Sequence, residues 1–128
     1  MVIYVQKIVE CKLVIESEIE GKKDNFEVNG RGYYKDENRV ITVYFSNGEN
    51  KYKFIYSDNK LVISFNESSY SFIEGSEDVG IIKSGNLALE IATYAYKLNI
   101  LENLFYVEYS FIQQGNIIGK YKCELSFY

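Results

Sequence analysis

The chain has 128 residues, of which 47% are hydrophobic, 25% charged and 16% aromatic, and it contains no histidine, proline or tryptophan. This length and balance fit one globular domain and exclude disordered and collagen-like chains. The net charge of −4 disfavours a nucleic-acid partner, because phosphate binding relies on a basic surface. Without histidine, Ser-His-Asp and Cys-His catalysis are excluded, and the commonest zinc ligand is missing.

Local features favour a cytoplasmic protein with no membrane span. The longest uncharged run, between Glu108 and Lys120, is far shorter than the roughly 20 residues that cross a bilayer. The segment from Met1 to Lys7 lacks the basic and apolar regions of an export signal. Cys11 and Cys123 are far apart and show no metal-binding spacing, so we expect two reduced thiols.

Alternation of apolar and polar side chains predicts the first strands. From Val9 to Ile19 the apolar residues fall mainly on odd positions, which indicates a long strand with one buried face. A turn is expected from Gly21 to Asn25, and a second alternating segment begins at Phe26. Gly30 and Gly32 lie on the apolar side of that segment, which favours a bend in the strand.

Four shorter strands are expected next, at the spacing of about ten residues that is typical of a meander, sandwich or barrel. Asn47-Gly48 favours a type I′ turn between the first two of them. The acidic segment from Glu74 to Asp78 predicts a loop after the fourth. The four strands are predicted at Val40–Ser46, Lys51–Ser57, Leu61–Phe65 and Ser69–Ile73.

The segment from Leu87 to Leu98 fits both a strand and a helix, and its pattern leaves both open. A final hairpin is predicted from Leu104 to Gln113 and from Ile117 to Tyr128. With no break in composition, residues 1–128 are expected to form one all-β domain, an antiparallel meander of about 8–10 strands. We favour a closed barrel over a sandwich, because closure removes exposed strand edges. The first and last strands would then be antiparallel, with Cys11 and Cys123 facing one interior.

Three short motifs resemble the YwiB-like family of small bacterial proteins. They are Phe72-x-x-Gly75, Gly85-x-Leu87-x-Leu89-x-Ile91-x-Thr93 and Gly32-Tyr33-Tyr34-Lys35. The resemblance spans nearly the whole chain and implies a lipocalin-like (calycin) meander barrel, with the Leu87 segment as a strand. It implies no established activity and no catalytic residue. The chain departs from the family before Gly85, where Gly80-Ile81-Ile82 replaces a polar Tyr-x-Thr step.

Barrels of this kind often enclose one small apolar ligand. The candidate ligand-binding residues each fall on the apolar side of their strand: Tyr34, Phe54, Phe72, Tyr109 and Tyr121. They could equally fill a core, but buried phenols need hydrogen-bond partners, which a cavity would supply. We therefore predict a non-enzymatic barrel, without cofactor, that binds a small hydrophobic or amphipathic ligand in its interior. The alternative is a filled barrel that acts as a protein-interaction or structural module.

Two groups of acidic residues could suggest a catalytic or a calcium site, but neither group has the enclosure or the spacing that such a site needs. Glu16, Glu18 and Glu20 share one strand face, yet nothing indicates that this face is enclosed, so we expect no catalytic residue. Glu74 and Glu77 do not match the spacing of a calcium-binding loop, and we expect no metal site. The sequence identifies neither the ligand nor the oligomeric state.

Overall fold

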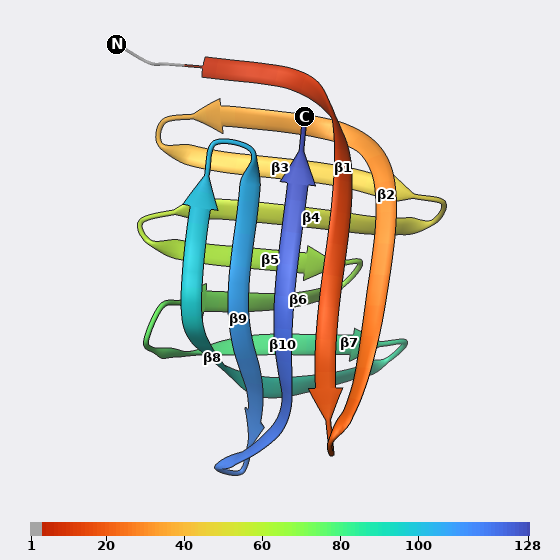
Figure 1. Ribbon diagram of the computed structural model, residues 1–128, viewed down its shortest axis with the longest axis vertical. Helices are drawn as coiled ribbons and strands as arrows, with labels where there is room; N and C mark the ends of the chain where they lie inside the picture. The colour runs from red at the N-terminus through yellow and green to blue at the C-terminus, as the bar shows by residue number, and fades with distance from the viewer. Residues whose placement is uncertain (1–3) are drawn as a thin grey trace.

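The alternating segments assemble into a closed antiparallel barrel in a computed structural model that describes residues 4–128 (Figure 1). Each strand pairs with its neighbours along the chain, and the first strand also pairs with the last. The described residues form ten strands: β1 (Tyr4–Ile19), β2 (Lys22–Glu37), β3 (Val40–Asn47), β4 (Asn50–Ser57), β5 (Lys60–Phe65), β6 (Ser68–Ile73), β7 (Glu77–Ser84), β8 (Leu87–Leu101), β9 (Leu104–Gln113) and β10 (Asn116–Phe127). The predicted all-β meander barrel is confirmed. Residues 1–3, which begin the segment considered for an export signal, lie outside the described residues.

Two groups of strands cross each other in the barrel. Figure 1 shows β8, β9, β10 and β1 upright in front, with β3 to β7 running across behind them. β2 and β8 bend, so that each belongs to both groups. β2 pairs with β1 along its whole length but with β3 only from Arg31 to Glu37. Within residues 4–128, the first half of β2 therefore has a partner strand on one side only.

Glycines make the bend in β2 possible. A β-carbon on Gly32 would collide with the carbonyl oxygen of Tyr44 on β3, and one on Gly30 would collide with the carbonyl oxygen of Ser46. Both glycines lie where β2 begins to pair with β3, since that ladder runs from Arg31 to Glu37. The predicted bend is present, and close approach of another backbone accompanies it.

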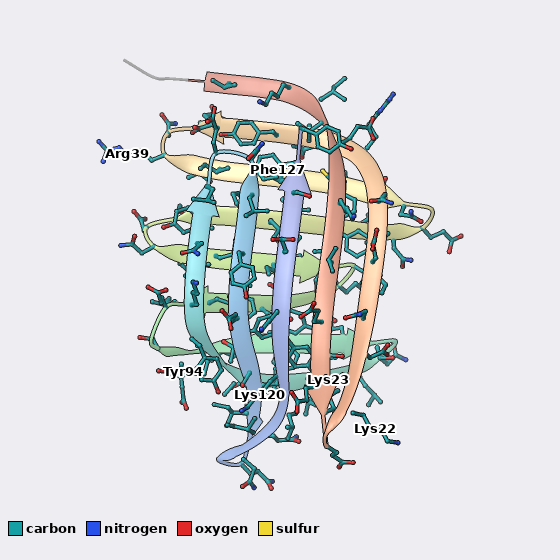
Figure 2. All side chains as sticks on the ribbon, viewed as in Figure 1. Lys22, Lys23, Arg39, Tyr94, Lys120 and Phe127 are labelled. Carbon is teal, nitrogen blue, oxygen red and sulfur yellow. The ribbon has the colours of Figure 1, made fainter. Side chains whose placement is uncertain are left out.

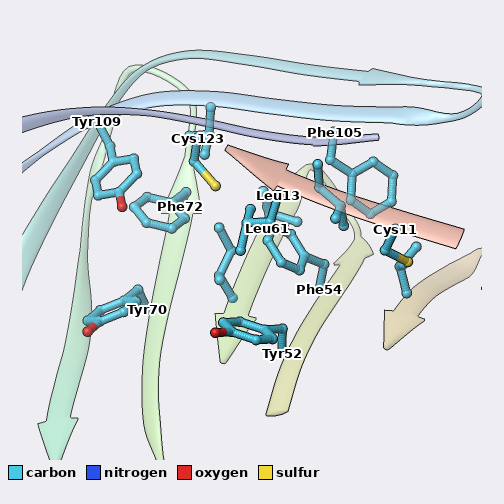
Figure 3. Packing of buried hydrophobic residues seen from close by; sticks show 14 of the residues in the cluster. Cys11, Leu13, Tyr52, Phe54, Leu61, Tyr70, Phe72, Phe105, Tyr109 and Cys123 are labelled. Carbon is cyan, nitrogen blue, oxygen red and sulfur yellow. The ribbon is translucent and has the colours of Figure 1, made fainter. Parts of the chain in front are cut away.

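Large apolar side chains fill the interior, as Figure 3 shows for part of the cluster. The largest fully buried side chains are Phe45, Phe54, Phe72, Phe105, Phe127, Leu13, Leu61, Ile63, Leu125, Val9, Val43 and Val107. Burial of each such side chain contributes about 1.5–3 kcal/mol relative to leaving it exposed. The core therefore combines phenylalanine rings with aliphatic side chains from strands all around the barrel.

Pairing of β1 with β10 closes the meander and places both thiols inside. Cys11 and Cys123 are free and buried, as expected from the alternation. Cys11 lies opposite Phe127 and Cys123 lies opposite Ile15, so the two thiols are offset along the strands. They face one interior without forming a disulfide.

Two turns differ from the sequence prediction. Asn47 is the last residue of β3 and pairs with Asn50, so the turn consists of Gly48 and Glu49. Gly48 has a φ of +61° and Glu49 has no positive φ, which corresponds to a type II′ turn in place of the predicted type I′. The first turn is also shorter than predicted, because β2 already begins at Lys22.

The predicted acidic loop is shortened by β7, which begins at Glu77 and was not among the expected strands. The first residues of β7 are polar, so the strand shows no clear alternation in the sequence. One of them, Asp78, is partly buried, and its carboxylate lies 3.3 Å from Lys60 Nζ, whose charge balances it. The ambiguous segment that follows is strand β8, as the family resemblance implies. The described residues include no helix of the length and apolarity needed to cross a membrane.

Candidate functional site

The five predicted ligand-binding residues lie at different levels of the barrel. Phe54, Phe72 and Tyr109 are fully buried, whereas Tyr34 and Tyr121 are half-buried and pack against the core. The ring of Tyr34 stacks on Phe127, with 5.6 Å between centroids, on the side of the molecule where β1 begins. The structure therefore does not bring the five together around one space.

Phe72, Tyr109 and Tyr121 do form a continuous aromatic cluster. The ring centroids of Phe72 and Tyr109 are 4.5 Å apart, and those of Tyr109 and Tyr121 are 5.1 Å apart. Phe111 joins this cluster and connects it to Tyr70, whose ring centroid lies 5.1 Å away. Tyr70 was not predicted, although it alternates with Phe72 along β6.

Missing β-carbons make room for two of these rings. A β-carbon on Gly80 would lie 2.7 Å from the Tyr70 ring, and one on Gly119 would lie 2.7 Å from the Tyr121 hydroxyl. Burial raises the pKa of Tyr109 well above its ordinary value of 10.0, with smaller contributions from Cys123 and the neighbouring phenols. The phenols therefore stay protonated at neutral pH and can act there as hydrogen-bond donors, not as bases.

An open hollow of about 660 Å³ lies on the other side of the same strands. It is lined by Glu16, Ser17, Glu18, Lys23, Asp24, Asn25, Tyr96, Glu108, Tyr109, Lys120, Tyr121 and Lys122. Most of these residues point outward by strand alternation, whereas Ser17, Asp24, Tyr109 and Tyr121 lie on the inward face of their strands and border the hollow from its inner side. Figure 2 shows Lys23 and Lys120 at the end of the barrel away from Phe127.

Charges of both signs alternate across the strands of the hollow. Glu16 lies opposite Lys122, which in turn lies opposite Glu108 on β9. Glu18 lies between Lys120 on β10 and Lys23 on β2. The sequence shows the row of glutamates but not that Lys120 and Lys122 face them, because these two lysines come from the opposite end of the chain.

Tyr96 supplies an aromatic wall of the hollow. A β-bulge between Ala95 and Lys97 interrupts the register of β8, and Tyr96 is exposed there. The Tyr96 hydroxyl lies 2.9 Å from Ser110 Oγ, and its ring packs edge-on to Tyr94 with 4.9 Å between centroids. The hollow thus combines charged groups with an oriented ring, and its volume is in the range of small-molecule sites.

Alkaline pH is expected to destabilise the fold through the buried thiols and Tyr109. Burial raises the pKa of Cys11 from 9.0 to about 12, with a contribution from Glu10, and burial also raises the pKa of Cys123. Because the folded pKa exceeds the unfolded one, the stabilisation is complete below about pH 9 and is lost as the pH rises towards the folded value. The slope reaches about 1.4 kcal/mol per pH unit for each group.

Urea denaturation from about pH 8 to about pH 11, followed by circular dichroism, measures this slope. Replacing both cysteines by alanine should flatten it above about pH 9.0, the ordinary pKa of a thiol, and leave the contribution of Tyr109 above about pH 10.0. An unchanged slope in the C11A/C123A variant would show that other groups cause the pH dependence.

Comparison with solved structures identifies the same fold in a protein described as "Crystal structure of ywiB protein from Bacillus subtilis". The alignment has a TM-score of 0.72, covers 94% of this chain and 92% of that chain, and shows 11% sequence identity. No family model matches the chain, and no curated protein matches it in sequence. The YwiB-like resemblance is therefore confirmed at the level of the fold.

Proposed function

We propose that the protein is a non-enzymatic binding barrel that takes a small amphipathic molecule with both a cationic and an anionic group. The observation that carries this proposal is the outer hollow, in which Glu16, Glu18 and Glu108 alternate with Lys23, Lys120 and Lys122 beside the Tyr96 ring. A zwitterionic head group can face both signs of charge at once, and a short apolar tail can lie on the ring. A molecule that carries only one sign of charge would face like charges in the hollow as well as opposite ones.

Interior binding is the second proposal, and the cluster of Tyr70, Tyr109 and Tyr121 favours it. These phenols offer hydroxyl groups beside apolar rings, which suits a small amphipathic ligand. In the structure, Phe54 and Phe72 occupy the adjoining space, each with 1% of its surface exposed. A ligand inside the barrel would have to displace such side chains, and we therefore place the outer hollow first.

Three probes with an eight-carbon chain test the proposal: octanoylcarnitine as the zwitterion, octyl sulfate as the anion and octyltrimethylammonium as the cation. We expect the zwitterion to bind most tightly and to shift the backbone amide signals of Glu16, Lys122 and Tyr96 in nuclear magnetic resonance spectra. Shifts centred on Phe54 and Phe72 would support the interior site instead. Binding of none of the three probes would overturn both proposals.

Neutralising one facing pair of charges should weaken binding of the zwitterionic probe without unfolding the protein. The E16Q/K122Q variant removes one carboxylate and one ammonium, and we expect its affinity to fall about tenfold. The matched control is E49Q/K53Q, because Glu49 and Lys53 are exposed and lie outside the hollow. Equal affinities in the two variants would show that the charges of the hollow do not recognise the probe.

A further inference from the structure

The first half of β2 presents backbone groups with no strand to receive them. Glu10 exchanges both backbone hydrogen bonds with Tyr128, the residue that follows β10, so the Glu10 amide and carbonyl point away from β2. Arg31 lies opposite Glu10, and its own backbone groups must point away from β1. By alternation, Lys23, Asn25 and Glu27 point in that same direction, beyond the range that β3 covers.

Two backbone groups of this edge are bonded to side chains of the same chain and not to a strand. The Asn47 side-chain amide donates to the carbonyl oxygen of Asn29 at 2.7 Å, and the Asn25 amide donates to Asp24 Oδ1 at 2.8 Å. The outward-pointing backbone groups of Lys23 and Glu27 have no hydrogen-bond partner among the described residues, and both residues are exposed. Such an edge can receive an added strand.

We propose that two copies of this chain associate through the Lys23–Asn29 edge of β2, with the two edges antiparallel. The charges of the edge indicate a second copy as the partner, because the edge carries one lysine and one glutamate four positions apart. When Asn25 lies opposite Asn25 of the other copy, Lys23 faces Glu27 of that copy on both sides of the two-fold axis. Registers shifted by a step in either direction lose these pairs or set like charges together.

The same register also matches the backbone. Lys23, Asn25 and Glu27 are the residues whose amides and carbonyls point outward, and each would meet an outward-pointing residue of the other copy. The Asn25 amide would exchange Asp24 Oδ1 for the carbonyl oxygen of Asn25 in the other copy. The two hairpins of β1 and β2 would then form one continuous sheet across the axis. Within one copy the Glu27 carboxylate lies 3.4 Å from Lys12 Nζ on the adjacent strand, so in the dimer it would lie between Lys12 and Lys23 of the other copy.

Charge reversal tests both the association and its register. The K23E and E27K variants each place like charges together, and we expect each to weaken self-association about tenfold or more. A mixture of the two variants restores opposite charges in both pairs, so it should form a heterodimer although neither variant dimerises well alone. Sedimentation equilibrium measures all three samples without any ligand.

The control variant is K53E, because Lys53 is exposed on β4, away from this edge, and should leave association unchanged. A wild-type chain that stays monomeric up to about 1 mM would overturn the proposal, and so would a dimer that the K23E and E27K variants leave intact. Lys23 also lines the hollow, whereas Glu27 does not, so the E27K variant tests association alone and the E16Q/K122Q variant tests the hollow through β1 and β10. Failure of one proposal is thus separable from failure of the other.

Discussion

A Gly32→Ala variant is expected to lose more than about 4 kcal/mol of unfolding free energy, or to fail to fold. A β-carbon at this position would collide with the carbonyl oxygen of Tyr44 and lie 2.7 Å from the α-carbon of Phe45. Backbone atoms cannot rotate away as side chains do, so relief requires separation of β2 from β3. That ladder closes the barrel on this side. Urea denaturation followed by circular dichroism measures the loss.

The control is Gly119→Ala, a second glycine within a strand. Its β-carbon would meet the end of the Tyr121 side chain, 2.7 Å from the hydroxyl oxygen, which can move aside. We expect a change of about 1 kcal/mol or less. Equal losses in the two variants would mean that the close approach of β3 is not the cause.

Strands whose two faces differ could be predicted from the sequence, because alternation is a local signal. β1, β9 and β10 alternate clearly, and their inward residues include Leu13, Val107 and Leu125, all buried as the pattern indicates. β8 could not be predicted in this way. Its bulge at Tyr96 shifts the alternation, so that the same residues also fit a helical period. The family resemblance supplied the correct choice there.

The candidate site depends on pairing between strands that are distant in the sequence. Alternation placed Glu16 and Glu18 on one outward face, but the register of β1 against β10 decides that Lys122 and Lys120 face them. Alternation also assigned Tyr34 and Tyr121 correctly to inward positions, but it did not indicate that they lie at different levels of the barrel. Register is a property of the closed sheet and is invisible in a single segment.

Replacing Phe72 by alanine is expected to cost about 3–5 kcal/mol of unfolding free energy. Phe72 has 1% of its surface exposed, faces Leu61 on β5, and packs against Tyr109 with 4.5 Å between ring centroids. Removing its ring leaves a cavity that the surrounding strands cannot fill, because they are held in the barrel ladder. Urea denaturation of the variant measures the loss.

The size of that loss decides whether Phe72 fills a core or lines a pocket. A side chain at the wall of an existing space has fewer contacts to lose, so truncation there would cost about 1 kcal/mol. Phe26→Ala is the matched control, since 46% of the Phe26 surface is exposed and we expect a loss of about 1 kcal/mol. The new cavity in the Phe72→Ala variant should also bind benzene and raise its melting temperature, as dry apolar cavities do. A loss as small as that of Phe26→Ala would instead favour a ligand space inside the wild-type barrel.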